Sequence, residues 1–239
     1  MKGVILAGGK GTRLQPATFA MNKHMVPILN RPMILYPLET LKTLGCTDIL
    51  IVSGGNHLGA FADFLGDGSA YQVSLTYRVQ KEAGGIAEAL GLARDFAAGE
   101  RVAVILGDNV FDNAQFEKMS GDGCALYVKK MPHPGRFGVL RKGRDGTSKT
   151  IIEKPSDAEP GELAVTGLYI YPAEVFNIIP TLVPSGRGEL EITDVNNHFL
   201  THTAQTTVTN ELTGFWSDAG TPESLAEVTA WAASKLLTA

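Results

Sequence analysis

Short apolar runs alternate with stretches of helical spacing along the first half of the chain. Continuous or alternating apolar runs predict strands, and apolar residues that recur every three or four positions predict helices. We expect strands at 3–6, 48–52, 73–79 and 101–106, and helices at 33–44, 57–65 and 86–96. Because strands that alternate with helices form parallel sheets covered on both faces, the pattern predicts an α/β protein with a mostly parallel, doubly wound sheet.

The second half of the chain is richer in strand patterns. Strands are expected at 125–129, 137–140, 148–152 and 164–171, and helices at 189–200 and from 222 to about 237. Thr221 is a good N-cap for the last helix, and Pro222 suits its first turn. There is no internal repeat, low-complexity segment or obvious linker, so one domain over 1–239 is the simplest interpretation.

Composition and charge narrow the classes of protein. The 239 residues are 44% hydrophobic and 19% charged, with a net charge of -4. This balance argues against a protein that coats nucleic acid or an anionic membrane, although a small anionic ligand needs only a local cluster of cations. Cys46 and Cys124 stand far apart, so a zinc site or disulfide framework is not expected. With no signal peptide and no apolar run of about 20 residues, we expect a cytoplasmic protein.

A glycine-rich loop directly follows the first predicted strand. Residues 6–13 read LAGGKGTR, with three glycines and two cations. Glycine lets backbone N–H groups converge on an anion, so this loop could hold a triphosphate; a plain strand-to-helix turn is the alternative. It is not a Walker A loop, because Lys10 is followed by Gly11 and not by Ser or Thr. It is not a Rossmann fingerprint either, because Leu14 stands at the last position of that motif.

Two cations strengthen the phosphate interpretation. Arg13 ends the loop, where its guanidinium could hold two phosphate oxygens at once. Lys23 is a lone cation in a short apolar stretch, and the nearby Pro27 and Pro32 favour an ordered loop there. The five histidines have no metal-like spacing and no catalytic role is expected for them, although His24, beside Lys23, is the one to inspect.

At this point the chain resembles the sugar-1-phosphate nucleotidyltransferases, above all short-form members that use dTTP and glucose 1-phosphate. The resemblance runs through residues 3–13 and then through nine further motifs in order: KHMVP at 23–27, RPM at 31–33, YRVQ at 77–80, GGIA at 84–87, LGDN at 106–109, EKP at 153–155, VTGLY at 165–169, RGELEITD at 187–194 and WSDAGT at 216–221. Several motifs in the right order are far more specific than one.

The resemblance implies a Rossmann-like α/β fold of the nucleotide-diphospho-sugar transferase type, with a mixed, mostly parallel central sheet flanked by helices. It implies a nucleotide-binding half at about 1–130 and a sugar-phosphate-binding half at about 131–239. The implied partners are a nucleoside triphosphate and a sugar 1-phosphate, and a homo-oligomer is left open. The nucleotide-binding residues that it implies are Leu6, Ala7, Gly8, Gly9, Gly11, Thr12, Arg13, Gln80, Gly85 and Asp108.

The sugar-phosphate side follows from the same resemblance. It assigns Gly138, Glu153, Lys154, Val165, Arg187 and Trp216 to this side. Members of the family often have two adjacent acids where this chain has Ile152 and Glu153, and a tyrosine where it has Phe137. Those departures leave Glu153 as the acid for the sugar hydroxyls and remove one hydroxyl contact. A surface ion pair before a proline turn is the alternative for Glu153 and Lys154.

The resemblance further implies that Asp108 and Asp218 hold Mg²⁺. Two carboxylates from distant parts of the chain suit Mg²⁺ when phosphate oxygens and water complete its ligands. From the residues alone, Asp108 could be a turn residue after Gly107, and Asp218 a residue near the start of the last helix. Gln80 could likewise be a polar strand end, although an amide suits the edge of a pyrimidine.

The expected chemistry needs no general base. A phosphate monoester has its second pKa at about 6, so a sugar phosphate is already mostly dianionic at neutral pH. The catalytic task is to bring two polyanions together, which explains the expected catalytic set of Arg13, Lys23, Asp108, Lys154 and Asp218. The alternatives are a transferase for UTP or CTP with another sugar phosphate, and a non-catalytic nucleotide-sugar sensor.

Overall fold

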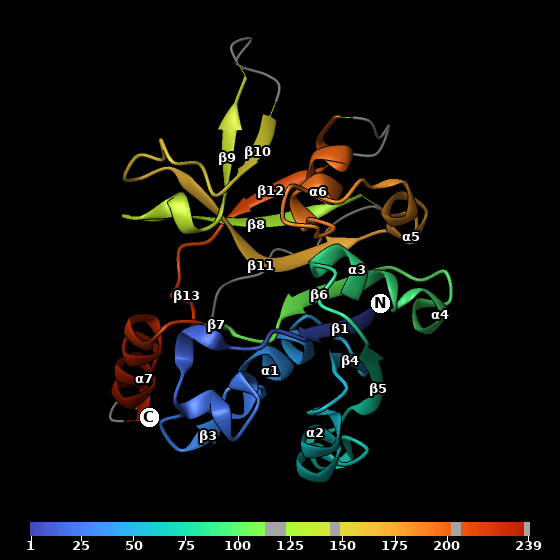
Figure 1. The fold of residues 1–239 in the computed structure, drawn as a ribbon, viewed down its shortest axis with the longest axis vertical. Coiled ribbons are helices and arrows are strands. Elements are labelled where there is room, and N and C mark those ends of the chain that lie inside the picture. Colours follow the sequence, from blue (N-terminus) through green and yellow to red (C-terminus); the bar gives the residue numbers. More distant parts are fainter. Residues whose placement is uncertain (113–122, 144–148, 202–206, 237–239) are drawn as a thin grey trace.

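The computed structural model describes residues 1–112, 123–143, 149–201 and 207–236, and its centre is a twisted nine-stranded sheet (Figure 1). Seven strands follow the order β10-β9-β11-β6-β1-β4-β5, while β8 pairs with β11 and with β12. The strands are β1 (Lys2–Ala7), β4 (Asp48–Gly54), β5 (Ser74–Gln80), β6 (Val102–Leu106), β8 (Ala125–Lys130), β9 (Gly138–Lys142), β10 (Lys149–Glu153), β11 (Leu163–Tyr171) and β12 (Val208–Glu211).

The first half of the chain supplies the parallel part of the sheet. Strand β1 lies between β4 and β6, β5 pairs with β4, and all three pairings are parallel. The carboxyl ends of these strands therefore meet at one edge of the sheet, which is where open α/β sheets bind their ligands. Gly8, Gln80 and Asp108 follow or end β1, β5 and β6 at that edge.

The second half extends the same sheet. Strand β11 pairs antiparallel with β6, β8 and β9, and β10 pairs antiparallel with β9. Because β12 is parallel to β8, only β10 and β11 run against the other strands of the described sheet. The sheet is thus mixed and mostly parallel, as the sequence predicted.

Helices cover both faces of the sheet, and the alternation of side chains along β1 shows why. Val4 and Leu6 belong to the apolar cluster on one face, whereas Ile5 and Ala7 belong to the cluster on the other. The first cluster includes residues of α3 (Ile86–Gly91), α4 (Arg94–Ala97), α5 (Val175–Ile178) and α6 (Ile192–Thr201). The second includes residues of α1 (Leu35–Thr43) and α2 (Leu58–Leu65). A strand buried on both faces reads as a continuous apolar run.

A third apolar cluster fixes the loop that carries Arg13 and Lys23. It joins Leu14, Ile28 and Met33 to Val228 of the last helix, α7 (Pro222–Leu236). In Figure 1, α7 lies beside the segment that contains β2 (Pro27–Ile28) and β3 (Arg31–Pro32). The Thr221 hydroxyl accepts the Ser224 N–H at 3.3 Å, so the predicted N-cap is confirmed.

Two expectations about helices need correction. The stretch 86–96 forms two short helices, α3 and α4, because the chain turns after Gly91, a poor residue within a helix. Helix α6 begins at Ile192 rather than at 189.

The short antiparallel pair of β7 (Asn109–Phe111) and β13 (Trp216–Asp218) was not predicted. No helix in the described ranges is long and apolar enough to span a membrane, and both cysteines are buried thiols.

Candidate functional site

A large hollow lies where the carboxyl ends of the parallel strands meet the second half of the sheet. Its volume is about 670 Å³. Every residue assigned to the nucleotide or sugar-phosphate side lines this cavity except Ala7 and Gly11. Ala7 is fully buried within β1, and a Cβ on Gly11, whose φ is 64°, would lie 2.8 Å from Cβ of Lys23. These two residues therefore shape the loop from behind the cavity wall.

Lys23 and Asp108 form the most enclosed ion pair at the site. The ammonium of Lys23 donates to Oδ2 of Asp108 at 2.5 Å, and both side chains are nearly buried. Burial alone would raise the pKa of Asp108, but the nearby positive charge, chiefly that of Lys23, and the hydrogen bonds from Lys23 and Asn109 together outweigh it and hold the pKa well below its ordinary value. Asp108 is therefore ionised throughout the physiological range.

Asp218 lies close to Asp108, although 110 residues separate them in the sequence. A Cβ on Gly220 would lie 3.3 Å from an oxygen of each carboxylate. Burial, and then the negative charge of Asp108, raises the pKa of Asp218 to about 6. Arg136 offsets part of this repulsion with hydrogen bonds of 3.0 and 3.2 Å to the two carboxylate oxygens of Asp218. The two acids thus face a common space in which a cation would be favoured.

Asn109 is a central residue of the site that the sequence analysis did not select. Its Oδ1 accepts the Gly167 N–H at 2.9 Å and Nε1–H of Trp216 at 2.7 Å. Its Nδ2 donates to Oδ1 of Asp108 at 2.9 Å. This buried amide ties the start of β7 to β11 and β13, and it orients the Asp108 carboxylate. The available signal was its place in the LGDN motif directly after Asp108.

Glu153 is the centre of the second charged group. It accepts from the Thr193 hydroxyl at 2.6 Å and pairs with Lys154 at 3.1 Å and with Arg187 at 3.7 Å. Lys154 has a φ of 44°, which is unusual for a residue with a side chain and is typical of functional loops. Arg187 is also held by Glu191 at 2.9 Å. The predicted sugar-side cations therefore lie together, each beside an acid.

Arg136 and Thr193 also line the cavity and were not predicted. Their partners, Asp218 and Glu153, are 82 and 40 residues away, so spacing along the chain gave no signal for them. Phe137 packs against Trp216 with ring centroids 5.0 Å apart, so the residue noted as a departure from the family still supports this wall of the cavity.

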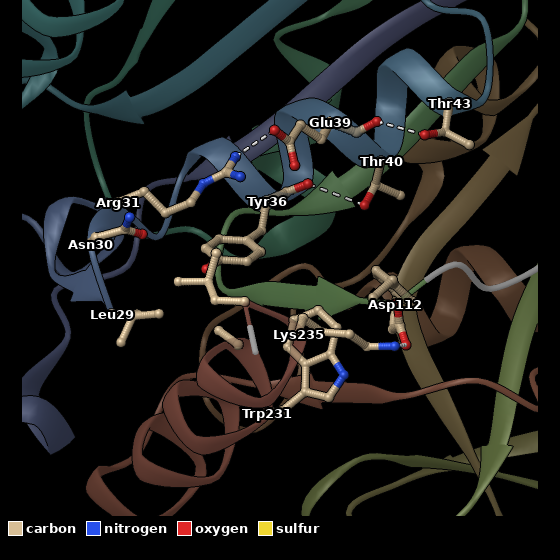
Figure 2. A pocket seen from close by; sticks show the side chains of 13 residues that line it. Leu29, Asn30, Arg31, Tyr36, Glu39, Thr40, Thr43, Asp112, Trp231 and Lys235 are labelled. Atoms are coloured by element: carbon tan, nitrogen blue, oxygen red, sulfur yellow. Dashed lines mark hydrogen bonds and ion pairs between the residues drawn. The ribbon is translucent and has the colours of Figure 1, made fainter. Parts of the chain in front are cut away.

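A second, smaller hollow of about 360 Å³ lies between α1 and α7 (Figure 2). Tyr36 and Trp231 line it, and ion pairs of Arg31 with Glu39 at 2.6 Å and of Lys235 with Asp112 at 2.7 Å lie at its edges. None of the residues predicted for phosphate, sugar or metal lines it. The larger cavity is therefore the candidate active site.

Comparison with known proteins identifies the class of protein to which the chain belongs. Residues 2–235 match the family model described as nucleotidyl transferase. Since the match covers almost the whole chain, the protein belongs to the nucleotidyl transferase family, and it is an enzyme of that class. The family resemblance identified from the motifs is thereby confirmed.

Particular relatives narrow the comparison. The chain is 38% identical over 234 residues to glucose-1-phosphate thymidylyltransferase of Neisseria meningitidis, covering 95% of this chain and 81% of that protein. It is also 38% identical to the low-salt glycan biosynthesis nucleotidyltransferase of Haloferax volcanii, covering 95% and 64%. A Bacillus anthracis chain, assigned as a glucose-1-phosphate thymidylyltransferase and solved with sucrose, is 43% identical with a TM-score of 0.86, covering 97% of this chain and 95% of that one.

Proposed function

We propose that the protein transfers a nucleotidyl group from dTTP to α-D-glucose 1-phosphate, giving dTDP-glucose and pyrophosphate with the help of Mg²⁺. The observation that carries the proposal is one cavity with two charged groups. Arg13, Lys23, Asp108 and Asp218 form the first, beside the glycine loop, and Lys154 belongs to the second, around Glu153. The names of the bacterial relatives support dTTP and glucose 1-phosphate as the substrates.

The two aspartates fit a magnesium ion that arrives with a triphosphate. No group of three or more His, Cys, Asp or Glu side chains suited to a metal occurs among the residues that the structure describes. Two carboxylates alone are too few for a dedicated metal cage, but they suit Mg²⁺, which usually keeps waters and takes phosphate oxygens. Burial and then the negative charge of Asp108 raise the pKa of Asp218, and a cation between the two carboxylates would relieve their repulsion. When bound there, Mg²⁺ would neutralise charge on the phosphate oxygens.

The protein groups then bind and orient two polyanions. A phosphate oxygen of the sugar phosphate attacks the α-phosphorus, the bond to the β-phosphate oxygen breaks, and pyrophosphate leaves with that electron pair. Arg13 holds the leaving phosphates, Lys23 contacts the α-phosphate and the sugar phosphate, and Lys154 holds the sugar phosphate. Backbone N–H groups of Gly8, Gly9 and Thr12 supply further donors. Positioning and charge stabilisation supply the rate, so no proton need be removed.

The proposal is tested with a matrix of dTTP, UTP, CTP and GTP against several hexose 1-phosphates, with pyrophosphate release as the readout. We expect the highest kcat/KM for dTTP with glucose 1-phosphate. If no pair releases pyrophosphate, the enzymatic proposal is wrong and a nucleotide-sugar sensor is favoured. If another pair is preferred, the choice of substrates is wrong.

The role of Arg13 has its own test. Arg13→Ala should lower kcat/KM by about a hundredfold or more, since it removes a charge contact to the phosphates. Arg94→Ala is the matched control, because Arg94 lies outside the cavity and contacts Asn177. Near-normal turnover by Arg13→Ala, in either direction of the reaction, would contradict this role.

A further inference from the structure

The side chain of Gln80 is fixed by two acceptors at the edge of the cavity. Gln80 ends β5, is 8% exposed and lines the cavity. Its Nε2 donates to the Glu88 carboxylate and, at 3.3 Å, to the carbonyl of Gly85. Glu88 lies in the first turn of α3, and its Oε2 would be 3.0 Å from a Cβ on Gly84. Gln80 and Glu88 therefore form a defined pair between β5 and α3.

The chemistry of this pair determines which end of the Gln80 amide faces the cavity. A carboxylate and a backbone carbonyl can only accept hydrogen bonds, so the amide nitrogen must face them. The amide oxygen is consequently turned the other way, toward Gly8, and it lies so close that no Cβ would fit on Gly8. Since Gly8 itself lines the cavity, Gln80 presents an acceptor there and keeps its donor for Glu88.

The surroundings of this acceptor suit a flat ring. Leu6, Ile86, Ala89 and Leu106 supply apolar surface to the same cavity. Gly85 supplies bare backbone with a φ of 105°, and a Cβ there would lie 2.7 Å from the Leu190 nitrogen. An apolar slot with one defined polar group at its edge is the usual form of a site that selects a small ring.

We propose that Glu88 is a positioning residue that fixes the Gln80 amide with its oxygen toward the base, so that the site selects thymine or uracil over cytosine. The proposal rests on the proposed function and on the nucleotide-binding role that the family resemblance implies for Gln80. Thymine and uracil carry an N–H at ring position 3 that can donate to this oxygen. Cytosine has an unprotonated nitrogen at that position, so two acceptors would face each other and a buried hydrogen bond would be lost. Among the nucleotides considered, this favours dTTP and UTP over CTP.

A purely structural role for Glu88 makes a different prediction. An acid in the first turn of a helix stabilises that helix whatever ligand is bound. Removal of such an acid lowers the stability of the protein and its affinity for all nucleotides alike, but it leaves the ratio of these affinities unchanged. The ratio of affinities for dTTP and dCTP therefore separates selection of the base from support of α3. Asp95, in the first turn of α4 and exposed, offers a matched acid that does not contact Gln80.

The experiment measures binding of dTTP, UTP and dCTP by calorimetry, without sugar phosphate, to the full chain and its variants. We expect Glu88→Ala to lower the preference for dTTP over dCTP by about tenfold, the scale of one hydrogen bond to a charged group. Glu88→Gln should retain part of the preference, because its amide oxygen can still accept from Gln80. Asp95→Ala should leave the ratio unchanged.

A double-mutant cycle supplies the decisive control. If Glu88 acts through Gln80, then Glu88→Ala should change the ratio in the parent protein but add nothing in the Gln80→Ala background. An unchanged ratio in Glu88→Ala, or an equal change in both backgrounds, would overturn the proposal. The proposal would also be overturned if Glu88→Gln and Glu88→Ala both lost stability and bound all three nucleotides less tightly by the same factor.

Binding also separates this inference from the proposed function. A protein that prefers dTTP and UTP to dCTP, loses the preference in Glu88→Ala and releases no pyrophosphate would retain the inference and refute the enzymatic reaction. A protein that releases pyrophosphate with dTTP and dCTP equally well would refute the inference and retain the nucleotidyl transfer. A protein that binds none of the three nucleotides would refute both.

Discussion

His24 is a buried histidine whose neutral form is required by its surroundings. It is 1% exposed, and its Nδ1 lies 2.7 Å from Oδ1 of Asn22, which also accepts the His24 backbone N–H at 2.9 Å. An amide oxygen can only accept, so Nδ1 carries the proton. Burial, and then the positive charge of Lys23, lowers the pKa of His24 to about 3. We therefore expect His24 to make the stability of the protein depend on pH.

The sign and size follow from the two states. The unfolded chain protonates this side chain below its ordinary pKa of 6.5, whereas the folded protein does so only near 3. Between these values the unfolded state binds more protons, so the free energy of unfolding falls as the pH falls, by about 1.4 kcal/mol per pH unit. From pH 7 to pH 5 the loss attributable to His24 is about 2 kcal/mol.

Asp218 opposes this trend. Its folded pKa of about 6 lies above the ordinary 3.8, so between these values the folded state binds the extra proton and gains stability as the pH falls. The wild-type curve alone would therefore show only part of the His24 effect. The perturbation is His24→Gln, which removes the titration of residue 24 and leaves Asp218 in place.

The assay is urea unfolding of both proteins between pH 5 and pH 8. The altered packing of the variant changes its free energy of unfolding by an amount that does not depend on pH. Only the pH dependence of the difference between the two proteins is therefore diagnostic. We expect the wild type to lose about 2 kcal/mol more than His24→Gln between pH 7 and pH 5. Two curves that stay parallel over this range would show that His24 is not held neutral, and the reasoning would be refuted.

Three other substitutions follow from the same structure. Asn109→Ala leaves the Gly167 N–H and Trp216 Nε1 without their acceptor, so the free energy of unfolding measured in denaturant should fall by about 2 kcal/mol or more. Turnover should also fall, because the amide no longer orients Asp108. Gly85→Ala should weaken dTTP binding far more than Gly99→Ala; both residues have positive φ, but only Gly85 has backbone within 4 Å of a new Cβ. Trp231→Ala removes the ring stacked on Phe215 at 4.7 Å and should cost about 2–3 kcal/mol of stability, measured as a lower Tm.

The parts of the fold that were predictable from the sequence are those with a strong local signal. Strand β1 is apolar at consecutive positions because it is covered on both faces, and that run is visible without a structure. The glycines after it mark the edge where the site lies. Helix α7 was predicted from Thr221 and Pro222, and its start at Pro222 agrees with the structure; the expected end near 237 lies outside the described residues.

The parts that were not predictable depend on contacts between distant residues. Strands β7 and β13 have three residues each, too few for a periodic signal, and their pairing brings Asp218 beside Asp108. Asn109 has an ordinary polar side chain in the sequence, and its importance comes from Gly167 and Trp216, which are 58 and 107 residues away. Recognition of the family, and not spacing, had suggested that the two aspartates act together.

Charge pairing is the property of the site that the sequence analysis missed most completely. Lys23 was expected as a free cation for phosphate, but in the described structure it is already paired with Asp108, and Arg136 is paired with Asp218. Each carboxylate thus has a counter-cation before any ligand binds, which limits the cost of burying two acids close together. A phosphate that binds Lys23 must compete with Asp108, and a cation that binds Asp218 must compete with Arg136. Entry of a phosphate together with a cation satisfies all four groups at once, because each released lysine or arginine gains an anion and each released carboxylate gains a cation.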